Sequence, residues 1–156
     1  MNELVRTRIT IQLDDFDPGL EFKSMIDQKD FEIGGLVTFI GLVRDISSDK
    51  NLKSMELEHY PDMTERALQN ICNEAKSKWC VRAITIIHSI GVLYPGDKIV
   101  YVSVASSHRN ESFQAVEFIM DFLKSRAPFW KKEITKRGCT WVDARTMDET
   151  ALNRWK

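Results

Sequence analysis

The segment from Ser106 to Glu133 constrains the fold most, because it predicts one helix with two defined ends. Asn110 can cap the helix, and Pro128 ends it near Arg126, since the residue before a proline avoids helical backbone angles. An apolar stripe follows the helical repeat of about 100° per residue, and it consists of Phe113, Val116, Met120 and Leu123. We therefore expect this helix to pack its stripe against a core.

Cations gather at both ends of this predicted helix. His108 and Arg109 lie just before it, Lys124 lies in its last turn, and Lys131 and Lys132 follow it. Helix N-termini attract anions through unpaired N–H groups and the helix dipole, so His108 and Arg109 have a physical reason to bind phosphate or carboxylate. The pattern predicts a pocket for a small, multiply charged anion.

Lys124 lies at the edge of the apolar stripe, about 20° from Phe113 around the helix. Partial burial lowers the pKa of a lysine, and a neutral amine is a base or a nucleophile. The alternative is a lysine whose stem covers apolar surface while its ammonium reaches water, which is the commoner fate of such residues. Position alone leaves both interpretations open.

Composition and charge limit the classes of protein. The 156 residues suit one domain, expected to span residues 1–156, and 43% hydrophobic residues indicate a globular chain. A net charge of −1, from 22 basic and 23 acidic residues, argues against general nucleic-acid binding. No apolar run is long enough to span a bilayer, and the N-terminus lacks a signal-peptide stretch. Cys72, Cys80 and Cys139 have no paired spacing and are expected to be reduced thiols in a cytoplasmic protein.

Apolar runs between turn signals predict strands in much of the chain. The expected strands are residues 8–13, 36–44, 55–60, 83–89, 98–105 and 138–145, with loops at 14–19 and 45–53 and a turn at 94–97. Gly41 interrupts its strand and marks a bulge or a close backbone approach. These elements favour a compact α+β domain with a largely antiparallel sheet.

Two further helices are expected. A short one spans Phe22–Gln28, and a longer one starts at Pro61, where Asp62 and Glu65 form a capping box. The longer helix has one apolar face, made of Leu68, Ile71, Cys72, Ala75 and Trp79.

Histidines and glycines form no metal or nucleotide motif in the sequence. His59, His88 and His108 are far apart and lack ligand spacing, so no metal is expected. The glycines match neither a dinucleotide fingerprint nor a phosphate-binding loop. His59 and His88 are interpreted as structural histidines with hydrogen-bond partners. Arg44 ends a strand, and by position alone it is an ordinary surface arginine.

Several short stretches together resemble one known family. They are Gly34–Arg44, Leu57–Met63, His88–Gly91 with Pro95–Asp97, Ser107–Arg109, and Lys124–Glu133 with Trp141–Val142 and Ala144–Arg145. In order and spacing, from about residue 34 to residue 145, the chain is similar to the large, catalytic subunits of molybdopterin synthase. The stretch KSRAPFWKKE, which begins at Lys124, is the most specific piece.

This resemblance implies an enzyme made of two proteins. In the family, a small ubiquitin-like subunit inserts a C-terminal tail, ending in a glycine thiocarboxylate, into a pocket of the large subunit. Two sulfurs pass to cyclic pyranopterin monophosphate, the cyclic phosphate opens, and the molybdopterin dithiolene results. The implied fold is an α/β hammerhead-like domain with an additional β-rich subdomain, and the implied assembly is a homodimer that forms a heterotetramer with the small subunit. The sulfur arrives on the partner, so no cofactor and no catalytic cysteine are expected on this chain.

The resemblance also implies site residues. Lys124 is the expected central catalytic residue, as a proton donor, base or transient acyl acceptor, and Lys131 is the second. His108 and Arg109 would hold the substrate phosphate. The other implied substrate-binding residues are Leu42, Val43, Arg44, Lys132, Glu133 and Arg145. Some relatives have a basic residue where this chain has Leu42, so a contribution from Leu42 would come from its backbone.

Two alternative functions stay open at this point. One is another transferase, of phosphoryl or acyl groups, that uses Lys124. The other is a non-catalytic adaptor that binds a ubiquitin-like tail. A pocket that accepts a tail cannot be a closed core, so apolar surface around Phe39, Phe129 and Trp130 is expected to be open or shared with another chain.

Overall fold

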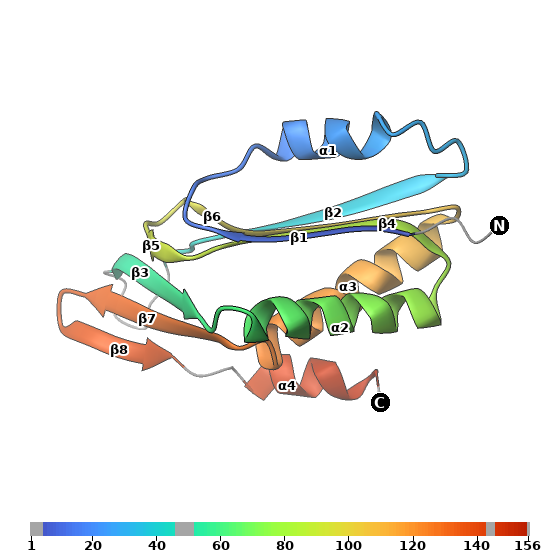
Figure 1. Cartoon of the computed structure of the whole chain (residues 1–156). Helices are drawn as coiled ribbons and strands as arrows, with labels where there is room; N and C mark the ends of the chain where they lie inside the picture. The colour runs from blue at the N-terminus through green and yellow to red at the C-terminus, as the bar shows by residue number, and fades with distance from the viewer. Residues whose placement is uncertain (1–4, 46–51, 143–145, 156) are drawn as a thin grey trace.

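The computed structural model describes residues 5–45, 52–142 and 146–155. The described residues form two four-stranded sheets and four helices, which confirms the expected α+β class with mostly antiparallel strands (Figure 1). In chain order the elements are β1 (Arg6–Gln12), α1 (Pro18–Ile26), β2 (Gly35–Leu42), β3 (Leu52–His59), α2 (Met63–Lys78), β4 (Val81–Ser89), β5 (Gly91–Leu93), β6 (Lys98–Ser106), α3 (Arg109–Ser125), β7 (Phe129–Thr135), β8 (Gly138–Val142) and α4 (Thr146–Asn153). Most of the loop expected at residues 45–53 lies outside the described residues.

The main sheet has the strand order β1-β4-β6-β2. Strands β1 and β4 run parallel, and the other neighbours run antiparallel. Helix α1 lies over one face of this sheet, while α2 and α3 cover the other (Figure 1). Because both of their faces are covered, β4 and β6 are buried almost throughout, which accounts for their nearly continuous apolar sequences.

The largest core cluster lies between the main sheet and helices α2 and α3. Ile86 and Val102 of the sheet meet Leu68 and Ile119 of the helices, and all four are fully buried. The apolar face expected for α2 is confirmed, with its alanine, leucine, isoleucine and cysteine positions buried and Trp79 packed against them. Burial of one such aliphatic side chain stabilises a fold by about 1.5–3 kcal/mol, so this layer fixes α3 against the sheet.

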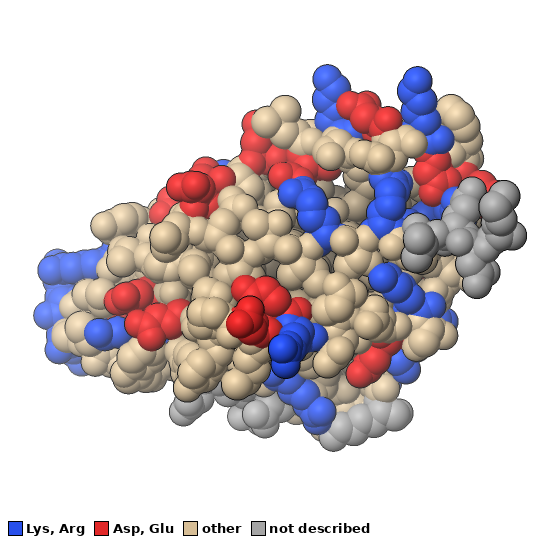
Figure 2. All heavy atoms as spheres, viewed as in Figure 1, with Lys and Arg blue, Asp and Glu red and all other residues tan. Residues whose placement is uncertain are grey.

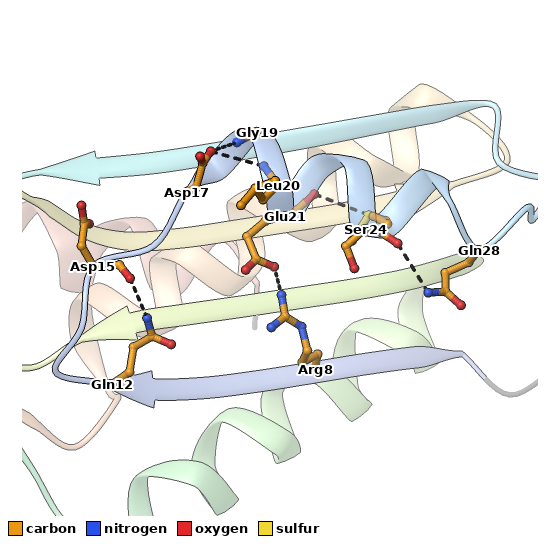
Figure 3. Close-up of polar contacts among 11 residues, drawn as sticks. Arg8, Gln12, Asp15, Asp17, Gly19, Leu20, Glu21, Ser24 and Gln28 are labelled. Carbon is orange, nitrogen blue, oxygen red and sulfur yellow. Dashed lines mark hydrogen bonds and ion pairs between the residues drawn. The ribbon is translucent and has the colours of Figure 1, made fainter.

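Helix α1 begins at Pro18, within the segment 14–19 that was expected to be a loop. The carboxylate of Asp17 caps it by accepting hydrogen bonds from two backbone N–H groups of the first turn, at 2.8 and 3.3 Å (Figure 3). Proline fits this turn because its missing N–H would have no helical partner there. An ion pair between Glu21 and Arg8 then ties α1 to β1 (Figure 3).

The capping box expected at the start of α2 is wrong. Asp62 occupies the capping position, but its φ is 69° and its side chain makes no capping hydrogen bond. A capping residue normally has extended backbone, and the left-handed φ of Asp62 departs from that geometry. Glu65 lies near His59 instead, with 3.5 Å between its Oε1 and the Nε2 of the histidine.

Helix α3 ends at Ser125, as expected, but the cap expected at Asn110 is wrong. His108 is the capping residue by position, and no side chain caps the helix. Buried serines hold the junction instead. The Ser106 hydroxyl lies 2.5 Å from the His108 carbonyl oxygen and 2.5 Å from the Ser112 hydroxyl.

The buried arc of α3 is rotated from the expected stripe. Its buried residues are Ser112, Ala115, Val116, Phe118, Ile119 and Met120. Phe113 is 60% exposed, so its expected place in the core is wrong. Around the helix, the centre of this buried face lies beyond Val116 in the direction of Ala115. Phe113 lies on the other side of Val116 and therefore falls at the edge of the buried face. Lys124 lies about 20° beyond Phe113 around the helix, and it is exposed as well.

The smaller sheet has the strand order β5-β3-β7-β8 and is antiparallel throughout. Strand β7 was not expected, because its sequence, FWKKEIT, shows no clear alternation, and its pairing with β3 and β8 imposes the extended form. The polar sequence of α4 likewise gave no helix prediction. The register shift between Gly41 and Leu42 confirms the bulge expected in β2. Among the described residues, no helix is long and apolar enough to cross a membrane.

Candidate active site

Lys124 lies in the last turn of α3, near the Arg126 C-cap. Its side chain is exposed in the single chain, so the partial burial expected for it is not present. Its positive charge nevertheless acts on the buried ring of His88, where it disfavours protonation. The end of α3 therefore lies beside the strand end that carries His88.

His88 has the structural role that was expected for it. It is 7% exposed, and its Nδ1 lies 2.8 Å from the Ser89 carbonyl oxygen. Burial is the largest cause that lowers the pKa of His88 to about 4; the charges of Lys124 and His59 act in the same direction, and the Ser89 hydrogen bond opposes them. The ring is therefore neutral at neutral pH. It stacks on Phe129, with ring centroids 3.9 Å apart and planes 16° apart.

Lys131 lies on the same face of β7 as Phe129, because residues two apart in a strand point the same way. In the register of the smaller sheet, Lys131 is opposite Leu57 and Phe129 is opposite His59. Glu133 shares this face, two residues further along. The two expected catalytic lysines thus border the His88–Phe129 stack from two different elements.

Lys132 points to the other face of β7. Its ammonium lies 5.8 Å from the ring centre of Trp141. Trp130 shares this face, and its ring meets that of Tyr60 edge-on, with centroids 4.0 Å apart and planes at 73°. Trp130 is 38% exposed and Trp141 56%. Lys132 therefore belongs to an exposed aromatic surface on the side of the sheet away from Lys131.

Leu42, Val43 and Arg44 lie where β2 ends. Val43 is buried, and its backbone N–H donates to the Asp97 carbonyl oxygen at 2.8 Å. Val43 packs in the same apolar cluster as Leu57, the residue opposite Lys131. Leu42 is 55% exposed, and Arg44 is exposed beside this cluster. The structure therefore brings the end of β2 to the region of Lys131.

His108 and Arg109 lie at the opposite end of α3 from Lys124. At 1.5 Å per residue the distance along the helix from Arg109 to Lys124 is about 22 Å. Two glycines at the start of β2 allow its backbone to approach this junction closely. A Cβ on Gly34 would clash with the Ser107 carbonyl oxygen, and a Cβ on Gly35 would lie 3.5 Å from the Cα of Arg109. Within one chain, His108 and Arg109 are therefore far from the group around Lys124.

The described cavities lie away from all predicted site residues. Two of them, of about 480 and 320 Å³, open between the α1 region and strands β1 and β4, and both are lined by Arg6 and Gln28. Arg82, which lines the larger one, is paired with Asp30 at 2.9 Å and with Glu32 at 2.8 Å. Among the described residues, no group of His, Cys, Asp and Glu side chains could hold a metal ion.

Thr64 is a positioning residue that sequence reasoning missed. It is fully buried, its hydroxyl accepts a hydrogen bond from the Tyr60 backbone N–H, and it donates to the Pro128 carbonyl oxygen, both at 3.1 Å. It thereby anchors the turn between Lys124 and Lys131 to the start of α2. Nothing local in the sequence marks it, because Pro128 is distant along the chain.

The remaining predictions have different outcomes. Arg145 lies outside the described residues. Phe39 is 40% exposed, and Trp130 is similarly open, as expected for an unclosed site, while Phe129 is half-buried in the His88 stack. Figure 2 shows basic side chains gathered at the end of the molecule formed by β7 and β8, where the turn carries exposed Lys136 and Arg137, which were not predicted.

Comparisons with known proteins agree with this architecture. The family model for the MoaE protein matches residues 11–126. The molybdopterin synthase catalytic subunit of Ralstonia nicotianae is 52% identical over 147 residues, covering 94% of this chain and 83% of the relative. The solved MoaE protein of Burkholderia ambifaria superimposes with a TM-score of 0.81 at 47% identity, covering 96% of this chain and 97% of that one. A Helicobacter pylori structure, described as the complex of subunits 1 and 2 of molybdopterin-converting factor, shares the fold at 18% identity, with a TM-score of 0.72 and coverage of 89% and 91%.

The fold and these relatives place the chain among the proteins of molybdenum cofactor biosynthesis. The chain belongs to the MoaE family, that of the catalytic subunits of molybdopterin synthase.

Proposed function

We propose that this chain transfers sulfur from the thiocarboxylated C-terminus of a small ubiquitin-like subunit to cyclic pyranopterin monophosphate. The observation that carries the proposal is the placement of Lys124 and Lys131. They come from the end of α3 and from β7, and they border one aromatic stack; Lys131 also lies opposite Leu57, which packs with Val43 beside Arg44. An anionic tail tip and an anionic substrate both require positive charge there.

The chemistry divides the cations into two tasks. Each sulfur transfer consumes one thiocarboxylate and leaves one carboxylate on the tail, with water supplying the oxygen. Lys124 would donate or accept the proton at the reacting centre, or hold the acyl group for a short time. Lys131 would orient the tail, or it would protonate the reacting centre from the other side of the Pro128 turn. His108 and Arg109 would hold the phosphate at the N-terminus of α3.

The proposed assembly is a homodimer that binds one small subunit at each end. Its support is the separation, by about 22 Å along α3, of the phosphate-binding pair from the lysine group. A pocket that needs both groups is incomplete in one chain and would be completed by a second. The complex of two subunits described for the Helicobacter pylori relative supports a small-subunit partner. The proposal places the enzyme in the cytoplasm, in keeping with the free thiols of Cys72, Cys80 and Cys139.

The test is reconstitution with purified components. The chain is mixed with the thiocarboxylated small subunit and the cyclic substrate, and the pterin product is analysed by mass spectrometry. We expect a product that contains two added sulfurs and an opened phosphate. Binding of the tail without any sulfur-containing pterin would refute the proposal and favour an adaptor. A small subunit that ends in a normal carboxylate is the matched control and should give no product.

A further inference from the structure

The face of the main sheet beneath α1 carries small and hydroxyl-bearing side chains. Because successive residues of a strand point to opposite faces, Ala83 and Thr85 of β4 lie on the α1 face, while Ile84 and Ile86 pack in the large core cluster on the other face. Ala83 packs with Met25, the single buried residue of α1. Side chains of this size do not fill the space between the sheet and the helix, so a hollow remains under α1.

Two neighbouring cavities make up this hollow. Their volumes are about 480 and 320 Å³, and Arg6 and Gln28 line both of them. Figure 2 shows the surface hollowed beneath α1, with basic side chains around the opening. Glu21 and Ser24 point from α1 toward the strands below it (Figure 3). Ligand pockets in proteins have volumes of about 300–1,000 Å³, so the hollow has room for a small organic molecule.

The side chains that line the hollow leave one positive charge without compensation, since four of them are basic and three are acidic. Arg8 forms an ion pair with Glu21, and Arg82 is held by two carboxylates of the segment after α1. Arg6 is the arginine of the hollow that has no carboxylate partner among the described residues. A single positive charge suits a ligand with one negative charge, while the neighbouring carboxylates would repel a doubly charged phosphate.

Arg6 also has hydrogen-bonding capacity that this chain does not use. It lies beside Ala83 in the register of the main sheet and therefore points to the α1 face. Its Nη1 lies 3.5 Å from the Met25 carbonyl oxygen, a long contact, and its Nη2 is buried without a partner among the described residues. A buried charged donor without an acceptor is costly. A carboxylate accepts two parallel hydrogen bonds from a guanidinium, so one carboxylate seated beside Arg6 would satisfy this capacity.

The larger cavity offers apolar surface next to this charge. Val5 and Val81 line it, and so does Phe31, which is 91% exposed. A large apolar side chain so exposed, at the mouth of a cavity, gives the ring of a ligand a surface to stack on. The hollow thus combines one free cation with an aromatic wall.

We propose that the hollow beneath α1 is a binding site for a small aromatic monocarboxylate. The carboxylate pairs with Arg6, and the ring lies in the larger cavity against Phe31. None of the described residues predicted for the active site lines either cavity. The proposal therefore adds a second ligand to this chain and does not depend on the proposed sulfur transfer.

The first experiment uses benzoate as the probe. The isotope-labelled full chain is titrated with benzoate at neutral pH, and the backbone amide signals are followed by NMR. We expect saturable shifts that are centred on Arg6, Gln28 and Phe31. Benzamide has the same ring without the charge, and inorganic phosphate has charge without a ring, so both controls should shift these signals far less. No saturable shift with benzoate, or an equal response to either control, overturns the proposal.

The second experiment removes the cation. Arg6→Gln keeps a hydrogen-bonding side chain but loses the charge, and it should weaken benzoate binding by about tenfold or more. Arg66→Gln, exposed on α2, loses the same charge elsewhere and should bind benzoate as the unmodified chain does. Circular dichroism checks that both variants are folded. Undiminished binding by folded Arg6→Gln contradicts the proposal, and so does an equal loss in Arg66→Gln.

The third experiment removes the aromatic wall and decides the matter if Arg6→Gln does not fold. The ring of Phe31 is almost fully exposed, so Phe31→Ala costs the fold little. We expect Phe31→Ala to weaken benzoate binding by about threefold or more, because the stacking surface is lost. Phe22→Ala, on exposed surface of α1 outside both cavities, is the matched control and should leave the affinity unchanged. Equal affinities of the two variants for benzoate would reject the site.

Discussion

The imidazole ring of His88 stacks on the phenyl ring of Phe129, with ring centroids 3.9 Å apart and planes at 16°. This contact joins β4 of the main sheet to β7 of the smaller sheet. Each lysine expected to act in catalysis is linked to one ring of this stack, since Lys124 disfavours protonation of His88 and Lys131 follows Phe129 on the same face of β7. The stack therefore couples the stability of the fold to the geometry of the site.

The buried His88 predicts a loss of stability in acid. The folded pKa of His88 is about 4, below its value of 6.5 as an unperturbed group. Between these values the unfolded chain binds a proton that the folded chain does not, so the free energy of unfolding falls as the pH is lowered from 6.5 to 4. The contribution is about 3 kcal/mol. His88→Phe keeps a ring on Phe129 but cannot titrate.

Urea denaturation at several pH values checks this prediction. Between pH 7 and pH 4 we expect the unmodified chain to lose more stability than His88→Phe, by about 3 kcal/mol. Parallel stability curves for the two proteins would show that His88 does not carry this effect.

Thr64→Val should destabilise the fold and the site together. Valine keeps the shape but removes the hydroxyl that pairs with the Tyr60 N–H and the Pro128 carbonyl oxygen. Leaving a buried polar group without a partner costs about 1–3 kcal/mol, and turnover should fall because Pro128 lies between the two lysines. Thermal denaturation and the product assay measure both effects. Thr140→Val, on exposed β8, is the matched control and should be nearly neutral. Equal behaviour of the two variants would remove the anchoring role.

Lys124→Ala should abolish nearly all turnover while the chain stays folded and still binds the small subunit. The side chain of Lys124 is exposed at the end of α3, so its removal costs little packing energy. The ammonium that would take part in the reaction is lost. Lys131→Ala should slow turnover less. The rate of dithiolene formation measures activity, and calorimetry measures small-subunit binding. Lys136→Ala, in the β7–β8 turn, controls for the loss of one positive charge. Near-normal turnover in Lys124→Ala would defeat the catalytic assignment.

Arg109→Ala should weaken binding of the cyclic substrate more than it affects the partner's tail. Loss of a charged hydrogen bond to phosphate is expected to cost about 1.5–3 kcal/mol of binding free energy. Calorimetry with the assembled complex measures the substrate affinity, and Arg66→Ala, exposed on α2, controls for charge. An unchanged affinity would show that the phosphate does not bind at the α3 N-terminus, and Arg44 would become the candidate for binding it.

Local signals in the sequence were enough to predict most elements of the fold. The apolar face of α2, the bulge at Gly41 and the end of α3 before Pro128 follow from periodicity and backbone restrictions, which act over a few residues. The anion site inferred from the cations around α3 stays a prediction, although the sequence alone shows where those charges lie along the chain.

Long-range packing decided what these local rules could not. Strand β7 exists because β3 and β8 pair with it, and the rotated buried arc of α3 depends on where the sheet lies. The capping predictions at Asp62 and Asn110 failed because cap geometry depends on how the chain enters the helix from a neighbouring strand. The sequence by itself determined which residues carry the charge. Tertiary structure alone decided that the Lys124 end of α3 comes beside His88, because that placement depends on how the helix packs against a sheet built from distant parts of the chain.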